Sequence, residues 1–258
     1  MGEQRTGSGR LSTRELKPQG PARPSGPLRL QRLRVRFARG EDVKYITHLD
    51  LMRFWERALR RAGVGLAYSE GFSPHPRLSL AAPLPVGVTS EAELMDVYLS
   101  TPVSPKEFLR RVSTELPAGF AVLEGEEVGL GLPSLQSEVR WAEYEVEGRL
   151  DGTQRELEEA VQRFLAAESI PWEHVREEKV RRYDIRALVR EMRVEEGPAA
   201  RYRLSMRLRC DNSATGRPEQ VAAALGLSEP DRIHRARLRL AGTSPTREAW
   251  RRAGRFLE

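Results

Sequence analysis

The sequence predicts an α+β protein made of two tandem ferredoxin-like units, each with the element order β-α-β-β-α-β and an antiparallel sheet. Segments that alternate apolar and charged residues indicate half-buried strands, and apolar residues at every third or fourth position indicate amphipathic helices. Both kinds of segment follow the same order in the two halves of the chain. The predicted parts are a disordered basic tail at 1–27, a first unit at 28–128, a linker at 129–137, a second unit at 138–242 and a C-terminal helix at 243–258.

The first unit begins with a strand at 28–39, in which apolar residues alternate with arginines. Thr47 fits a helix N-cap, because Asp50 follows three residues later and apolar residues such as Trp55 share one side of the helix. Gly63 fits the end of this helix. The remaining predicted elements are an extended run at 75–80, a strand at 93–100, a helix from Ser104 to Pro117 and a strand at 120–128.

The second unit repeats this order without visible sequence identity to the first. Its predicted elements are a strand at 139–150, a helix at 153–167, strands at 184–195 and 201–210, a helix at 218–225 and a strand at 233–240. Gly197 and Pro198 separate the two middle strands as a hairpin-type break. The segment at 168–183 is longer than a connection in this element order requires, and no helix or strand is predicted there.

The composition favours a protein with a polyanionic partner such as RNA, because the formal charge is +6 and the pI is near 9.8. Half of this charge lies in residues 1–27, which hold five basic and two acidic side chains. No apolar run is long enough for a membrane span or a signal peptide, so a cytoplasmic protein is expected. The single cysteine, Cys210, excludes an intramolecular disulfide and a cysteine-ligated zinc or iron–sulfur site. We therefore expect no cofactor and no metal.

Arginines on the predicted strands are the first candidate for a binding site, since the helix-free face of such a sheet is often its working surface. They are Arg32, Arg34, Arg36 and Arg77 in the first unit, and Arg203, Arg207, Arg209, Arg235, Arg237 and Arg239 in the second. Such an array can hold an RNA backbone, with Tyr98 or Phe72 available for stacking. Glu143, Glu145 and Glu147 alternate on a neighbouring strand, so charge pairing across strands is the competing interpretation.

The loop at 71–77 is the second candidate. Its residues are Gly71, Phe72, Ser73, Pro74, His75, Pro76 and Arg77. The prolines restrict the backbone on both sides of His75, whose imidazole is therefore held with little freedom. His48 and Asp50 at the helix start are candidate acid–base partners, and Arg217 in a later turn can contact an anion.

These residues carry a resemblance to a known family. Residues 46–99, ITHLDLMRFWERALRRAGVGLAYSEGFSPHPRLSLAAPLPVGVTSEAELMDVYL, closely resemble the signature of the radical SAM-linked family, a bacterial domain of unknown function. The later motifs RYDIRALV and TGRPEQV are similar to its second half. Members of that family occur beside, or fused to, a cobalamin-binding radical SAM protein, so the resemblance implies such a partner. This chain has no CxxxCxxC motif and cannot itself be the radical enzyme.

Three functions are compatible with these observations. The preferred one is an accessory or substrate-recognition protein for a radical SAM enzyme, with RNA, such as tRNA or rRNA, as the hypothetical substrate. The second is an RNA-processing or RNA-modifying enzyme that uses His48 and His75, which rests on fold analogy. The third is a protein-interaction scaffold whose arginine-rich helix face docks an acidic partner. That face consists of Arg53, Arg57, Arg60 and Arg61.

Overall fold

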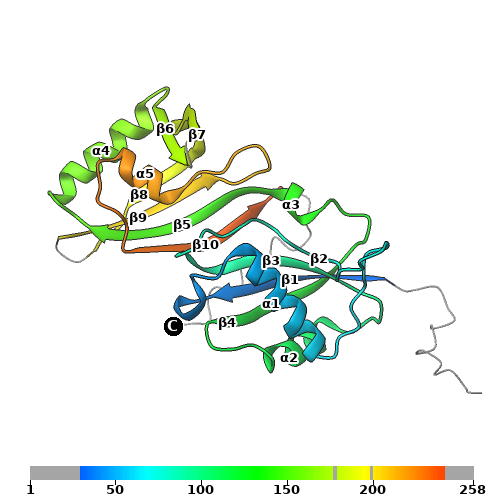
Figure 1. The fold of residues 1–258 in the computed structure, drawn as a ribbon. Helices are drawn as coiled ribbons and strands as arrows, with labels where there is room; N and C mark the ends of the chain where they lie inside the picture. Colours follow the sequence, from blue (N-terminus) through cyan, green and yellow to red (C-terminus); the bar gives the residue numbers. More distant parts are fainter. Residues whose placement is uncertain (1–29, 177–178, 198–199, 242–258) are drawn as a thin grey trace, which may run out of the picture.

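The computed structural model describes residues 30–176, 179–197 and 200–241. The predicted tail and the predicted C-terminal helix at 243–258 lie outside these residues. Within them the chain has a mixed α+β fold with one mostly antiparallel eight-stranded sheet and a separate two-stranded sheet (Figure 1). No helix in this part of the chain is long and apolar enough to cross a membrane.

The first half follows the predicted element order, and its strands lie in the order β4-β1-β3-β2. Its elements are β1 (Gln31–Arg39), η1 (Glu41–Val43), α1 (His48–Arg61), β2 (Leu78–Leu80), β3 (Thr89–Leu99), α2 (Pro105–Ser113) and β4 (Phe120–Val128). The N-cap prediction is confirmed, since the Thr47 hydroxyl accepts the backbone N–H of Asp50 at 3.3 Å. Trp55 on α1 is fully buried, and its ring packs edge-on against Phe37 of β1 at 4.8 Å between centroids.

The second half also follows the predicted order, with strands arranged β10-β5-β9-β8. Its elements are α3 (Leu135–Glu138), β5 (Val139–Arg149), α4 (Gln154–Ala166), β6 (Pro171–Arg176), β7 (Lys179–Asp184), η2 (Arg186–Leu188), β8 (Val189–Val194), β9 (Arg201–Arg209), α5 (Pro218–Ala224) and β10 (Arg232–Leu240). A capping box between Thr153 and Glu156 opens α4. The sequence pattern missed the β6–β7 hairpin, which occupies the unassigned residues 168–183.

The two halves share one sheet, so the prediction of two sheets is wrong. β10 pairs with β3 in parallel, placing His234 opposite Thr89 and Arg235 opposite Ser90. The reason is the shortness of β2, which covers only residues 95–97 of this edge of β3. The start of β3 would otherwise expose unpaired backbone groups, and β10 satisfies them.

A buried ion pair lies at this junction. Arg235 has no exposed surface, and its Nη2 lies 2.5 Å from Oε1 of Glu93. The same guanidinium donates to the carbonyls of Ala82 at 3.2 Å and Pro83 at 3.3 Å. Burial alone would lower the pKa of Arg235, but the charge of Glu93 raises it overall. The guanidinium therefore remains charged and ties β10 to the first half.

The predicted linker at 129–137 contains part of a structural element. It leads into α3, whose Leu135 is completely buried in the core of the second half. The preceding carbonyls of Leu132 and Pro133 accept hydrogen bonds from Arg32 at 2.9 and 2.8 Å. This segment therefore packs across the sheet rather than merely connecting two units.

Removing the Arg235 charge is expected to destabilise the whole sheet. Arg235→Leu leaves the Glu93 carboxylate buried without its partner, which costs about 3–5 kcal/mol of unfolding free energy. Urea denaturation followed by circular dichroism measures this. The matched control is Arg237→Leu, because Arg237 is 56% exposed and lies 3.6 Å from Glu143. The control should cost at most about 1 kcal/mol, and equal losses for both variants would contradict the prediction.

Candidate nucleic-acid interface

Three of the predicted RNA-contacting arginines are buried. Arg32 and Arg34 are each 1% exposed, and both donate to the carboxylate of Asp96. Nη2 of Arg34 also lies 2.9 Å from Oε2 of Glu138, the last residue of α3. The prediction that these two arginines face RNA is wrong, because the segment before β5 covers this face of the first half and completes their coordination. Arg235 is also excluded from RNA contact, because it is buried against Glu93 at the junction of the two halves.

The exposed arginines of the second half are paired with glutamates. Arg207 and Arg239 lie 3.0 and 2.7 Å from Oε1 of Glu143, and Arg237 lies 3.6 Å from its Oε2. Burial would raise the pKa of Glu143, but the hydrogen bond from Arg239 and the charges of the other two arginines lower it overall. Arg203 is paired in the same way with Glu147, at 3.3 Å.

The competing interpretation of this face is therefore confirmed for these pairs. Two further arginines follow the same rule: Arg209 pairs with Asp211 at 2.7 Å, and Arg36 of the first half pairs with Glu124 at 2.6 Å. A phosphate approaching such a face meets carboxylates beside the guanidiniums. The net attraction for a polyanion is consequently small.

The loop at 71–77 is the tip of a β-hairpin formed by residues 66–78. Leu66 pairs with Leu99 at the end of β3, and Tyr68 pairs with Pro76 across the hairpin. Backbone hydrogen bonds from Ser69 N to His75 O and from Arg77 N to Ala67 O, at 2.9 and 2.8 Å, hold the two sides together. The hairpin lies at the end of the molecule where β1 begins (Figure 1).

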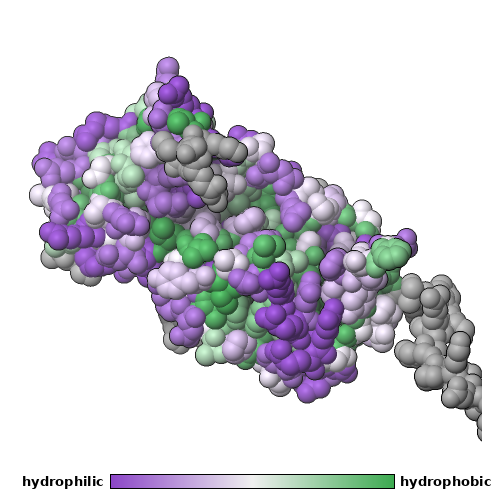
Figure 2. Space-filling view, viewed as in Figure 1, coloured by the Kyte–Doolittle hydropathy of each residue, from purple (hydrophilic) through white to green (hydrophobic). Residues whose placement is uncertain are grey.

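Arginines beside this hairpin stack on tyrosines. The guanidinium carbon of Arg60 lies 5.9 Å from the ring centroid of Tyr68, and that of Arg77 lies 4.4 Å from the ring of Tyr98. Arg57, one turn before Arg60 on α1, is also exposed. Figure 2 shows hydrophilic residues gathered over α1.

These three arginines differ from those of the sheet in their partners. Within the described residues, no carboxylate lies within 4.0 Å of Arg57, Arg60 or Arg77. Glu56 and Glu70 occur on the same surface, but neither forms an ion pair with a described residue. Phe72 at the hairpin tip is 108% exposed, so its ring contacts no other part of the protein. The surface thus combines unneutralised guanidiniums with accessible aromatic rings.

The structure does not bring His48 and His75 together. His48 begins α1, and the loop before it is bonded to Gly87 near the start of β3. His75 lies in the hairpin, which is bonded to Tyr98 near the end of β3 and packs beside Arg60 in the last turn of α1. At 1.5 Å per residue, residues 48 and 60 lie about 18 Å apart along the helix. The two imidazoles therefore do not form a concerted catalytic pair.

The other predicted site residues have local roles. Asp50 accepts the hydroxyl hydrogen of Thr47 at 2.7 Å within the helix cap. Arg217 precedes α5, is 43% exposed and lies 3.6 Å from Glu219. No described group of three or more histidine, cysteine, aspartate or glutamate residues is arranged to hold a metal ion.

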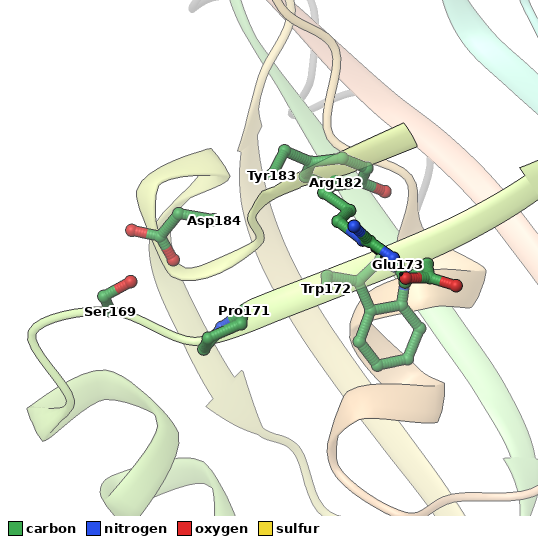
Figure 3. A pocket seen from close by; sticks show the side chains of 7 residues that line it. All are labelled: Ser169, Pro171, Trp172, Glu173, Arg182, Tyr183 and Asp184. Carbon is green, nitrogen blue, oxygen red and sulfur yellow. Dashed lines mark hydrogen bonds and ion pairs between the residues drawn. The ribbon is translucent and has the colours of Figure 1, made fainter. Parts of the chain in front are cut away.

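A pocket of about 460 Å³ lies on the β6–β7 hairpin, and Figure 3 shows the side chains that line it. Its lining residues are Ser169, Pro171, Trp172, Glu173, Arg182, Tyr183 and Asp184. Arg182 donates to Glu173 at 2.8 Å, and backbone N–H groups of Ile170 and Arg186 donate to Asp184. These backbone bonds, with that from Ile170 the largest cause, lower the pKa of Asp184. The charged side chains that line the pocket are therefore already bonded to residues of the hairpin or next to it.

A family model described as an uncharacterized protein conserved in bacteria (DUF2344) matches residues 32–218. The chain belongs to this bacterial family. Among solved structures, the family member is similar to a Cbf5–Nop10–Gar1 complex, with a TM-score of 0.45 and 10% identity over 80% of this chain and 48% of that chain. It is also similar to an archaeal box H/ACA sRNP Nop10–Cbf5 complex, with a TM-score of 0.40 and 11% identity over 79% and 46%.

The DUF2344 chain thus spans about half the length of these two structures' chains. A comparison with curated proteins finds no match. Neither the family description nor the names of the two structures mention a radical SAM protein, so that partnership stays a prediction.

Sequence reasoning did not identify the surface of this DUF2344 protein as a unit. The sequence places Arg60 on a helix face that could dock an acidic partner, and it gives Tyr68 no role. The available signal was the spacing between them, since a tyrosine seven residues after the helix end can fold back beside its last turn. His234 was also missed; its Nδ1 lies 2.9 Å from the Thr89 hydroxyl, and burial lowers its pKa.

Gly65 is expected to fix the position of the hairpin against β3. A Cβ at this residue would lie 2.7 Å from both Cβ and Oγ1 of Thr101, so Gly65→Ala forces the two segments apart. Such overpacking costs about 1–3 kcal/mol, and thermal unfolding should show a Tm lower by several degrees. Gly131→Ala is the matched control, because nothing lies within 4 Å of its added Cβ. An unchanged Tm for Gly65→Ala would contradict the expectation.

Proposed function

We propose that this protein is an RNA-binding accessory protein that recognises an RNA substrate, such as tRNA or rRNA, for a radical SAM partner. The observation that carries the proposal is the surface of the 66–78 hairpin. There, Arg60 and Arg77 stack on tyrosine rings without carboxylate partners, and Phe72 is fully exposed. Guanidiniums in this state are available to phosphate oxygens, which they bind through paired N–H groups.

The stacked tyrosines support this proposal in a second way. A guanidinium resting on an aromatic ring keeps its N–H edge free, while the ring limits the number of conformations of the arginine. Less side-chain entropy is then lost when a phosphate is bound. The glutamate-paired arginines of the sheet lack this property, because a phosphate must displace a carboxylate to reach them.

The radical SAM partner enters the proposal through the resemblance in residues 46–99. In this scheme the chain supplies substrate recognition and the partner supplies the chemistry. The separation of His48 from His75 favours an accessory protein over an RNA-modifying enzyme that uses both histidines.

We also propose that each half is a ferredoxin-like unit fused edge to edge with the other. The element order β-α-β-β-α-β and the strand orders β4-β1-β3-β2 and β10-β5-β9-β8 support this. Under this proposal, the 66–78 hairpin is an insertion between the first helix and second strand of the first unit.

Charge removal beside the hairpin tests the RNA proposal. The double variant Arg60→Gln, Arg77→Gln should bind cellular RNA at least about tenfold more weakly, and the slope of log affinity against log salt should fall by about two. Electrophoretic shift assays over a range of salt concentrations measure both quantities.

The matched control is Arg237→Gln, Arg239→Gln, which removes the same charge from the glutamate-paired face. This control should leave the salt slope nearly unchanged. Equal weakening by both double variants would mean that overall charge, and not the hairpin, determines binding. Absence of any salt-dependent RNA binding by the unaltered protein would rule out the RNA proposal itself.

A further inference from the structure

The hairpin tip carries a feature that electrostatic contact with phosphates does not explain. Phe72 is fully exposed, although transferring a phenylalanine side chain from water into a protein interior is worth about 1.5–3 kcal/mol. The backbone directs it outward, because Gly71 adopts φ of 121°, a conformation that side-chain-bearing residues rarely take. Pro74 and Pro76 restrict the backbone on the other side of the tip.

The tip is also held by hydrogen bonds on its inner side. The Ser69 hydroxyl accepts the backbone N–H of His75 at 3.1 Å, and the Ser69 N–H donates to the carbonyl of His75 at 2.9 Å. Tyr98 N donates to Arg77 O at 2.9 Å and so joins the base of the hairpin to β3. These bonds hold the backbone on both sides of the tip, so Phe72 projects from an anchored segment before any ligand arrives.

We propose that the hairpin binds single-stranded RNA, with an unpaired base stacked on Phe72. This inference rests on the proposed function and names the form of RNA that the site takes. An exposed ring offers a flat apolar surface, and the partner that matches it in RNA is the face of a base. In a duplex these faces are covered by neighbouring base pairs, whereas loops and ends leave them free.

The positions of the arginines agree with a single strand that passes over the tip. Tyr68 pairs with Pro76, whereas Arg77 pairs with Ala67, so Tyr68 and Arg77 face opposite sides of the hairpin. Arg60 accompanies Tyr68 on one side, and Arg77 occupies the other. A flexible strand can place phosphates on both sides of the tip while one base stacks on Phe72. A rigid duplex presents one convex surface and cannot reach both.

Binding to matched single-stranded and double-stranded RNA tests the inference. Fluorescence anisotropy with the full chain should be carried out on a labelled 12-nucleotide single strand and on the same strand annealed to its complement. The single strand should bind at least about tenfold more tightly than the duplex. Phe72→Ala should weaken binding to the single strand by about tenfold, the range typical of one base–aromatic stack. Binding to the duplex should not change.

Two further variants separate stacking from other effects. Phe72→Trp should retain or tighten binding to the single strand, because it keeps an aromatic face. Tyr45→Ala removes another exposed aromatic residue, 71% exposed and outside the hairpin, and should have no effect. The salt slope of Phe72→Ala should equal that of the unaltered protein, since no charge is removed.

Each contrary result has a defined meaning. Equal affinity for single strand and duplex, with no effect of Phe72→Ala, overturns this inference and leaves the proposed RNA function in place. An equal loss of both affinities in Phe72→Ala also overturns it, because stacking on an unpaired base would spare the duplex. If neither RNA binds at any salt concentration, the proposed function fails as well as this inference.

Discussion

A guanidinium that leaves water must receive carboxylate or carbonyl partners in return, and this requirement shapes the central sheet. Arg235 satisfies it with Glu93 and the carbonyl groups of Ala82 and Pro83, all from the other half of the chain. Arg32 and Arg34 satisfy it with Asp96 on β3 and with groups from the segment before β5. Arg235, Arg32 and Arg34 therefore need residues far away in sequence, and the halves cannot separate without exposing these partners.

The same requirement explains why the sheet face is a poor surface for nucleic acid. Arginines on β9 and β10 flank a row of glutamates on β5, and Glu143 alone receives three of them. These arginine–glutamate ion pairs stabilise neighbouring strands through charge pairing across them. They also weaken the field on which polyanion binding depends. A high arginine content in the strands consequently contributes more to folding than to the attraction of RNA.

Much of the fold could be predicted because helices and strands are encoded by local patterns. The burial of Trp55 and the cap at Thr47 follow from spacing within one helix, and the strand of residues 120–128 coincides with β4. The joining of the sheets has no local signal, since the β3–β10 pair links residues about 145 positions apart. The burial of Arg32 and Arg34 could not be predicted for a related reason. Alternation indicates which residues share a face, but not which distant segment covers that face.

Arginine occurs in three environments in this protein, and the environment indicates whether an arginine stabilises the fold or is available to a ligand. Arg235 is buried and bonded, Arg207 is half-exposed and paired, and Arg77 is exposed and stacked on a ring. Only the third state leaves the N–H groups of the guanidinium without an acidic partner. The stack on Tyr98 gives such a group a fixed position without neutralising its charge, which an ion pair cannot do. A hairpin anchored on β3 is a suitable place for this state, because its base lies on rigid backbone while its tip remains in solvent. Stacked arginines and an outward phenylalanine therefore occur together because the hairpin is anchored at its base on β3 and exposed at its tip.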